Sequence, residues 1–179
     1  MRTYQAKALG FTLIELMVTV VIIAIFAMIA IPSYQYFVAK SRKSQAQAEM
    51  QKISERLENY KGKQLNYAGF IPYKQVSGQK GLVYLPYDST STSFDYQLYV
   101  SDINYAYDAS DTSQSTPLFQ PLEDSTIGQG WRVIAIPNQT KTSALRKMDS
   151  LLLDSKGVRC ATTDVLTSTS SSCPNSKEW

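Results

Sequence analysis

The pattern of apolar positions divides the chain into two unequal parts. Residues 11–31, FTLIELMVTVVIIAIFAMIAI, form an apolar run that contains one carboxylate, Glu15. As a helix this run would be about 32 Å long, enough to cross a hydrocarbon core of about 30 Å. A short basic leader precedes the run and a long polar segment follows it. The pattern therefore predicts one membrane-crossing helix followed by a single polar domain.

The periodicity changes after the apolar run. Pro32 lacks a backbone donor, so we expect a kink or a locally melted turn there. Helical periodicity then resumes with an apolar stripe on one face, formed by Ala46, Met50, Ile53, Leu57 and Tyr60. Gly62 is expected to cap the end of this helix. A half that is apolar on all sides must lie in lipid or among identical helices, whereas a half with one stripe must lie against a folded domain.

Strand patterns begin near residue 81. Residues 81–85 and 131–136 are short apolar runs, and residues 151–160 indicate a hairpin with its turn at 154–157. Residues 94–100 alternate, which predicts four side chains on the buried face: Phe94, Tyr96, Leu98 and Val100. We therefore expect an α+β fold. A long N-terminal helix, with a membrane-embedded first half and an amphipathic second half, packs on a roughly four-stranded antiparallel sheet.

Composition excludes most catalytic chemistry. The chain has no His, which removes His-dependent acid–base catalysis and most zinc and iron sites. It also lacks a nucleophile motif and a phosphate-binding loop, so we expect no enzyme, no catalytic residues and no cofactor. Asp102, Asp108 and Asp111 do not have the spacing of a calcium loop, and we expect no metal.

The formal charge of +3 conceals a segregation of charge along the chain. Residues 33–64 carry seven Lys and Arg against three Glu, and residues 81–130 carry seven acidic residues and no Lys or Arg. Residues 131–179 again carry seven basic against four acidic residues. One interpretation is solvated surface charge. The other is head-to-tail packing of many copies, acidic face against basic face.

Two cysteines, Cys160 and Cys173, lie near the C-terminus. In a chain that leaves the cytoplasm, such a pair usually forms a disulfide. A loop of this size would stabilise the fold by about 3 kcal/mol in the chain-entropy model.

Neither a cleaved secretory signal nor a plain anchor accounts for the N-terminus. A secretory signal has a shorter apolar stretch followed by an A-x-A site. Here the run carries a charge, and Ala24, Ala27 and Ala30 are spaced by three residues. A plain anchor explains the length of the run but not Glu15, because an ionised carboxylate in lipid costs several kcal/mol unless it is paired.

The segment Gly10-Phe11-Thr12-Leu13-Ile14-Glu15-Leu16 resembles the processing signature of type IV pilins and their relatives. The resemblance implies that residues 1–10 are a leader, that prepilin peptidase cuts between Gly10 and Phe11, and that Phe11 is then N-methylated. It also implies a partner for Glu15, the free α-amine of Phe11 on a neighbouring subunit that joins the filament. Such a pair would neutralise two charges that are each expensive in lipid.

The same resemblance implies a division of the chain and a set of partners. Residues 11–31 would be the transmembrane and filament-core helix, 32–62 its amphipathic half, and 63–179 a globular β domain with a C-terminal disulfide loop. The partners would be major and minor pilin subunits, prepilin peptidase and the inner-membrane assembly platform. The chain would cross the inner membrane once, with its C-terminal domain in the periplasm, before entering an extracellular pilus of a Gram-negative-type bacterium.

Residues 32–35, 46–48, 55–60 and 67–68 resemble PilE-type minor pilins, which help to prime or cap a filament. We therefore expect a structural pilus subunit, a minor pilin, that serves twitching motility, adhesion or DNA uptake. One alternative is a type II secretion pseudopilin, which has the same N-terminus. The other is a DNA-binding uptake pilin, with a candidate DNA patch at Lys141, Arg146, Lys147, Lys156 and Arg159. Acidic residues of the middle loops argue against such a patch.

Overall fold

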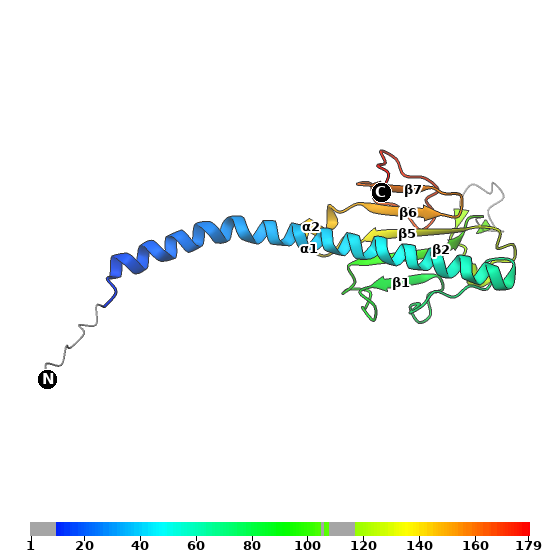
Figure 1. Cartoon of the computed structure of the whole chain (residues 1–179), viewed down its shortest axis with the longest axis horizontal. Coiled ribbons are helices and arrows are strands. Elements are labelled where there is room, and N and C mark those ends of the chain that lie inside the picture. The colour runs from blue at the N-terminus through cyan, green and yellow to red at the C-terminus, as the bar shows by residue number, and fades with distance from the viewer. Residues whose placement is uncertain (1–9, 105, 108–116) are drawn as a thin grey trace, which may run out of the picture.

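The structure, a computed structural model, describes residues 10–104, 106–107 and 117–179. Its longest element is the helix α1 (Leu13–Gln64), whose first half projects away from the globular domain (Figure 1). The helix ends at Leu65, which adopts the left-handed conformation with φ of 66° and donates its N–H to the Lys61 carbonyl at 2.7 Å. The prediction that Gly62 caps the helix was therefore wrong, because Gly62 lies within the last helical turn.

The domain is built on one antiparallel sheet with the strand order β1-β2-β5-β6-β7. These strands are β1 (Leu82–Leu85), β2 (Tyr96–Asp102), β5 (Trp131–Pro137), β6 (Ser150–Asp154) and β7 (Arg159–Thr162). The remaining elements are a small separate hairpin of β3 (Ala106–Tyr107) and β4 (Pro117–Leu118), the 3-10 helix η1 (Leu122–Asp124) and the short helix α2 (Ser143–Arg146). The predicted α+β class is confirmed, and the sheet has five strands where roughly four were expected.

The second half of α1 packs across one face of this sheet (Figure 1). Ala46, Met50, Ile53 and Leu57 are buried, as the apolar stripe predicted, and Tyr60 is partly buried. Facing them are Tyr96, Leu98 and Val100 of β2. Leu98 lies opposite Ala135 of β5, which in turn lies opposite Leu151 of β6, so one row of side chains crosses three strands beneath the helix.

Phe94 does not belong to this inner face, and its predicted position was wrong. It packs with Leu82 and Tyr84 and stacks on the Tyr84 ring with centroids 4.7 Å apart. The reason is local, because the Phe94 N–H bonds to the Thr90 carbonyl in a turn and the strand begins only at Tyr96. The alternation of β2 therefore cannot be extended back to Phe94.

The other face of the sheet is covered by the C-terminal tail. Ile134, Ile136 and Leu152 pack there with Leu166 and with Cys160, which is joined to Cys173 by a disulfide. The tail then returns to the edge of the sheet, where Lys177 pairs with Ala161 and the Trp179 indole N–H donates to the Cys160 carbonyl at 2.9 Å. Burial on both faces explains why β5 and β6 are apolar without alternation.

Candidate assembly and interaction surfaces

The apolar half of α1 is not packed against any other part of the chain that the structure describes. Its large side chains are exposed, for example Leu13 at 79% and Ile23 at 66%, and its most apolar stretch buries no residue. Within the described residues, α1 is the one helix long and apolar enough to cross a membrane, by length and composition. An apolar surface of this extent marks a membrane or protein contact, so this half must find lipid or other chains.

The N-terminus of α1 shows how Glu15 is placed. Thr12 caps the helix, and its Oγ1 accepts the Glu15 backbone N–H at 3.3 Å. The sequence Thr12-Leu13-Ile14-Glu15 thus has the spacing of a capping box, in which the acidic residue lies in the first turn near the positive end of the helix dipole. Within the described part of the chain, the Glu15 carboxylate has no hydrogen-bond or ion-pair partner. It is available to a group from another molecule.

Gly10 and Phe11 precede the helix and are exposed. A side chain added at Gly10 would meet no atom within 4 Å, so the fold itself does not require glycine at this position. Residues 1–9, which hold the rest of the predicted leader, lie outside the described residues.

Pro32 lies at the joint between the two halves of α1. The helix continues through it, and Figure 1 shows the helix gently bowed over its apolar half. The subunit therefore lacks the locally melted turn that was one of the two expectations at Pro32, and the kink stays a prediction. Ala39 is the first buried residue of the helix, so the joint lies just before the packed region.

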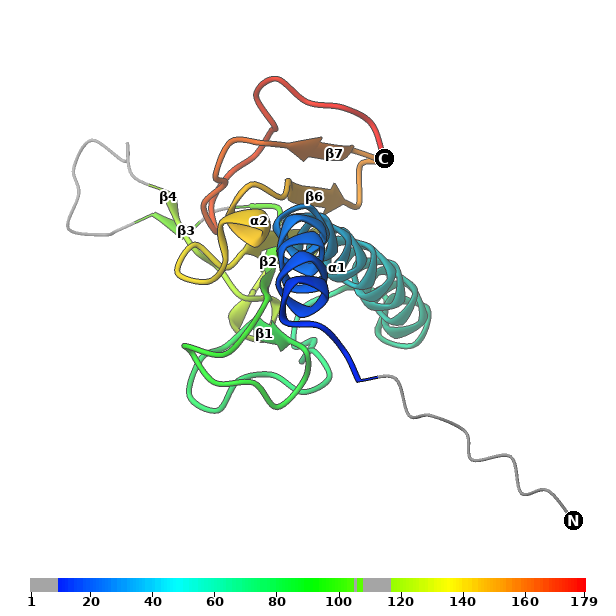
Figure 2. The same ribbon diagram turned by 90° about the vertical axis from the view of Figure 1, so that its left-hand side faces the viewer.

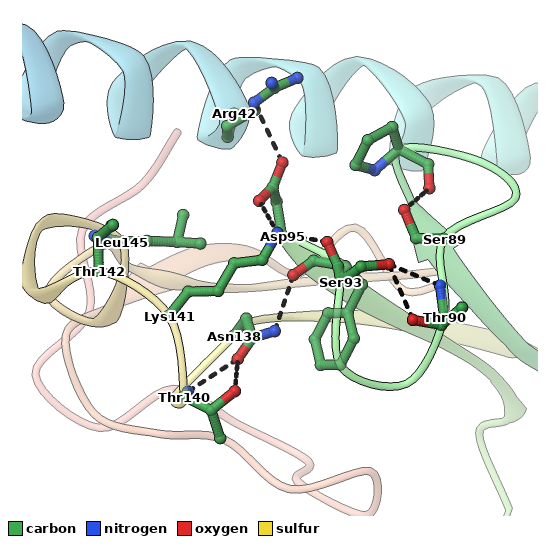
Figure 3. A network of polar contacts seen from close by, with 12 residues as sticks. Arg42, Ser89, Thr90, Ser93, Asp95, Asn138, Thr140, Lys141, Thr142 and Leu145 are labelled. Carbon is green, nitrogen blue, oxygen red and sulfur yellow. Dashed lines mark hydrogen bonds and ion pairs between the residues drawn. The ribbon is translucent and has the colours of Figure 1, made fainter.

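The short helix α2 lies beside α1 at the end of the domain that faces the apolar half (Figure 2). Leu145 and Met148 are buried in the same core as Ala39. An ion-pair cluster fixes the junction: the Asp95 carboxylate is 3.1 Å from the Arg42 Nε and 2.7 Å from the Lys141 Nζ (Figure 3). These contacts connect α1, the start of β2 and the loop before α2.

Two grooves flank the contact between α1 and α2. The first has a volume of about 290 Å³ and is lined by Tyr36, Lys40 and Lys43 of α1 and by Lys147 and Asp149 on the other side, among others. We call it the lysine groove. The second, of about 280 Å³, is lined by Tyr34, Val38 and Leu145 and contains the Asp95 cluster, among others.

The structure does not bring the five residues of the candidate DNA patch together. Lys141, Arg146 and Lys147 lie around α2, before β6, whereas Lys156 and Arg159 follow β6 at the β6–β7 turn. A five-residue strand spans roughly 17 Å. Two members are also engaged, because Lys141 pairs with Asp95 and the Arg159 guanidinium lies over the Trp179 ring at 5.2 Å. Sequence reasoning missed that Lys40 and Lys43 lie beside Lys147, since more than a hundred residues separate them.

Glu49 is the buried carboxylate of α1, with 5% of its surface exposed. Tyr87 donates a short hydrogen bond to it, the Lys52 Nζ lies at 3.3 Å, and an Arg56 nitrogen lies at 3.7 Å. Burial, the hydrogen bond to Glu49 and the Glu49 charge raise the pKa of the Tyr87 phenol. The buried charge is therefore fully compensated within the chain.

Asp102, the described member of the calcium candidates, has a structural partner set. Its Oδ1 accepts the Asn104 N–H at 2.8 Å, and its Oδ2 accepts from the Ser125 hydroxyl and from the Gly128 N–H at 3.2 Å. Asp108 and Asp111 lie outside the described residues. Among the residues that the structure describes, no group of three or more His, Cys, Asp or Glu side chains is placed to hold a metal.

Two protein-family models match consecutive parts of the chain. Residues 5–31 match the model of the prokaryotic N-terminal methylation motif, and residues 32–118 match the model of the type IV minor pilin ComP, DNA uptake sequence receptor. No solved structure matches.

Curated relatives are type IV fimbrial proteins. The type IV major fimbrial protein FimA of Dichelobacter nodosus is 58% identical over 40 residues, which cover 22% of this chain and 26% of that protein. The fimbrial protein EcpC of Eikenella corrodens is 60% identical over 37 residues, covering 21% of this chain and 24% of that protein. Another FimA of Dichelobacter nodosus is 36% identical over 91 residues, covering 46% and 57%. The chain thus spans about a quarter of the length of the first curated relatives that it matches.

The chain belongs to the type IV pilin family. Three findings support this class: a helix that is half exposed and half packed, the N-terminal motif, and the matches to fimbrial proteins. This is a family of structural proteins and not of enzymes. Within it, the polar part of the chain up to residue 118 is similar to a minor pilin that is named as a DNA uptake sequence receptor.

Proposed function

We propose that the chain is a structural subunit that waits in the inner membrane and is then built into a type IV pilus as a minor pilin. The observation that carries this proposal is the asymmetry of α1, whose first half is apolar and exposed and whose second half is packed on a completed domain. Lipid covers the first half before assembly, and the same halves of neighbouring subunits cover it afterwards.

Glu15 is the residue that we assign to assembly. Its carboxylate lies in the first turn of an otherwise apolar segment and has no partner within the described residues. Cleavage between Gly10 and Phe11 would create an α-amine one residue before the cap residue Thr12. A Phe11 amine of a neighbouring subunit would then neutralise Glu15, and losing one member of a desolvated pair costs about 3–5 kcal/mol.

The test must separate this ion pair from the capping role of Glu15. Gln can occupy the same capping-box position as Glu but carries no charge. We therefore compare Glu15→Gln and Glu15→Ala with Glu55→Ala, which removes an exposed carboxylate from the packed half of α1. The measurement is the amount of mature subunit in sheared filaments relative to the amount in the membrane fraction.

Both Glu15 variants should be cleaved and should enter filaments at least about tenfold less than the unaltered chain, since 1.4 kcal/mol already corresponds to a factor of ten. Glu55→Ala should behave as the unaltered chain does. Normal incorporation of Glu15→Gln would show that only helix capping matters and would contradict the ion pair.

The assignment as a minor pilin is supported by the match of residues 32–118 to a minor pilin model. The curated relatives include major fimbrial proteins, so copy number is the property to measure. We expect this subunit to be a small fraction of the protein in sheared fibres. If it is the dominant band, the minor-pilin proposal is wrong.

DNA uptake is a second candidate function, favoured by the description of the family model that matches residues 32–118. DNA binding by Lys and Arg is strongly salt-dependent, because phosphate neutralisation releases counterions. We would measure binding of a duplex to the full chain in detergent by fluorescence anisotropy over a salt series. R146Q/K147Q and K156Q/R159Q remove equal charge at the two ends of β6, so they report which end contacts the duplex. Absence of binding at low salt would remove this candidate.

A further inference from the structure

The lysine groove holds more positive charge than the described residues around it compensate. Of its three lysines, Lys43 forms an ion pair with Asp149 across the groove. Lys40 and Lys147 are exposed, and neither has a carboxylate partner within the described part of the chain. Two lysines that line a cavity of about 290 Å³ are therefore left without a carboxylate partner among the described residues, because the Asp149 carboxylate in the same groove pairs with Lys43.

The groove lies close to the membrane end of the domain. Lys40 follows Ile31, the last residue of the apolar run, by nine residues, which is about 13 Å along the helix. The headgroup layer extends roughly 5–7 Å beyond the hydrocarbon on each side of a bilayer. Helical side chains lean toward the N-terminus of their helix, which for Lys40 is the direction of the membrane, and a lysine stem can extend to place its ammonium among headgroups. An average tilt of about 20° would bring one flank of the domain closer still.

The residues between the apolar run and the groove fit the same location. Tyr34, Tyr36 and Phe37 are exposed, at 69%, 59% and 69%, although the domain begins only two residues further on. Tyrosine, which joins an apolar ring to a polar hydroxyl, is enriched at the membrane–water interface, so Tyr34 and Tyr36 suit this location. Tyr36 also lines the groove, so the interfacial aromatic segment and the lysine groove are continuous.

We propose that the lysine groove binds the headgroup phosphates of anionic phospholipids while the subunit is held in the membrane. This inference rests on the membrane-inserted state of the proposed function. A phosphodiester supplies an anion for Lys40 and Lys147, which have no carboxylate partner among the described residues. A volume of about 290 Å³ is at the lower limit of ligand pockets and suits one headgroup. A nucleic-acid duplex is disfavoured as the occupant, because the bilayer itself occupies the space next to this end of an inserted subunit. Binding tilts the domain with α2 toward the bilayer, and entry into a filament releases it.

The first experiment uses the full chain in nanodiscs of phosphatidylcholine, with or without phosphatidylglycerol. Acetylation rates of individual lysines are measured by mass spectrometry. Lys40 and Lys147 should react about fivefold more slowly when phosphatidylglycerol is present, the factor expected for about 1 kcal/mol per lysine near an anionic surface. Lys63 and Lys156, which lie at the opposite end of the domain, should react equally in both discs.

The second experiment compares K40Q/K147Q with K63Q/K156Q, which removes the same charge at the far end. Native mass spectrometry after mild detergent extraction counts the phosphatidylglycerol molecules that each protein retains. K40Q/K147Q should retain at least about fivefold fewer, since it removes two lysines that each contribute about 1 kcal/mol, and K63Q/K156Q should match the unaltered chain. Both variants keep the Lys43–Asp149 ion pair. If K40Q/K147Q fails to fold, as judged by near-ultraviolet circular dichroism, the acetylation rates of the unaltered chain still test whether the groove binds anionic lipid.

Three results would overturn the proposal. Equal acetylation of Lys40 and Lys147 in both discs would show that lipid charge is not recognised, and equal slowing of all four lysines would show only a general surface effect. Protection in neutral discs by inorganic phosphate or by a short DNA duplex would identify the groove as a site for a free anion or for nucleic acid. None of these measurements requires filament assembly. If Glu15→Gln entered filaments normally, the assembly role of Glu15 would be wrong, but the lipid-binding measurements would still test the lysine groove.

Discussion

The two halves of α1 have the same secondary structure and opposite relations to the rest of the chain. Residues 13–31 expose side chains on every side, whereas Ala46, Met50, Ile53 and Leu57 of the second half are buried in the domain core. Helix propensity alone does not distinguish them, because most helical stability in proteins comes from packing of an apolar face. The second half is stabilised by its own chain, and the first half must obtain its stability from lipid or from other subunits.

Each half also carries one glutamate in an apolar setting, and these two glutamates differ in whether the described part of their own chain provides partners for the carboxylate. Glu49 is buried and has Tyr87, Lys52 and Arg56 as partners. Glu15 has only its backbone contact with Thr12 in the described residues. A polar residue in an apolar stretch can therefore have its partners inside one subunit or be left for a neighbouring subunit, and the structure of one subunit distinguishes the two cases.

The largest difference between the halves should appear when an aliphatic side chain is truncated. Leu57→Ala removes a fully buried side chain and should lower the free energy of unfolding by about 2–5 kcal/mol. Ile23→Ala makes a comparable truncation at an exposed position of the apolar half and should change it by less than about 0.5 kcal/mol. Urea unfolding in detergent, followed by near-ultraviolet circular dichroism of the domain, measures both. Equal destabilisation would show that the apolar half is part of the same folding unit.

A smaller effect is expected when the buried glutamate is replaced. Glu49→Ala leaves the Tyr87 hydroxyl without its acceptor and should cost about 1–3 kcal/mol. Glu55→Ala, an exposed position on the same half, is the matched control and should stay within about 0.5 kcal/mol. If Glu49→Ala leaves the free energy of unfolding unchanged, solvent satisfies the former partners of Glu49. Glu49 would then contribute no more to the stability of the subunit than Glu15 does.

The smallest expected effect is on the pH dependence of stability, compared between a tyrosine inside the packed region and one outside it. Burial and the nearby Asp149 charge raise the pKa of the Tyr96 phenol, so Tyr96 contributes stability that is present below about pH 10 and is lost as the pH rises through its folded pKa. Tyr96→Phe loses a hydrogen bond to the Asp149 carbonyl, which should cost about 1 kcal/mol at pH 7.

Above pH 10 the stability of Tyr96→Phe should fall less steeply than that of the unaltered chain. The fall should not vanish, because burial also raises the pKa of Tyr67, Tyr87 and Tyr99. Tyr34→Phe, at an exposed tyrosine beside the apolar half, serves as the control for the loss of one phenol. An unchanged slope in Tyr96→Phe would mean that Tyr96 ionises as readily in the folded chain as in the unfolded one.

The sequence predicted those features that depend on local spacing. The stripe from Ala46 to Leu57 and the turn at residues 154–157 are examples, since the Asp154 carboxylate accepts the Lys156 and Val158 N–H groups and Gly157 has φ of 88°. Errors arose where a nonlocal contact or a specific backbone conformation intervened. Leu65 instead of Gly62 caps α1, and a turn directs Phe94 to the outer face of the sheet.

The candidate sites also divide into those that local spacing identifies and those that only the fold assembles. Gly10, Phe11 and Glu15 belong to one short motif, residues 10–16, which can be identified without a structure. The basic residues from Lys141 to Arg159 are neighbours in sequence, yet β6 separates them into two groups and Asp95 engages one of them. No sequence pattern links Lys40 to Lys147, because only the packing of α2 on α1 places them on one groove.

The linear pattern therefore predicts the organisation of the chain: one long helix with an apolar and an amphipathic half, an N-terminal methylation motif at its start and a β domain after it. These depend on composition and period, which a linear chain carries completely. Tertiary structure determines which charges meet, which face of the sheet the tail covers, and that Glu49 has partners whereas the Glu15 carboxylate has none within the described residues. Such outcomes depend on residues distant in the sequence, whose contacts exist only once the sheet has folded against the helix.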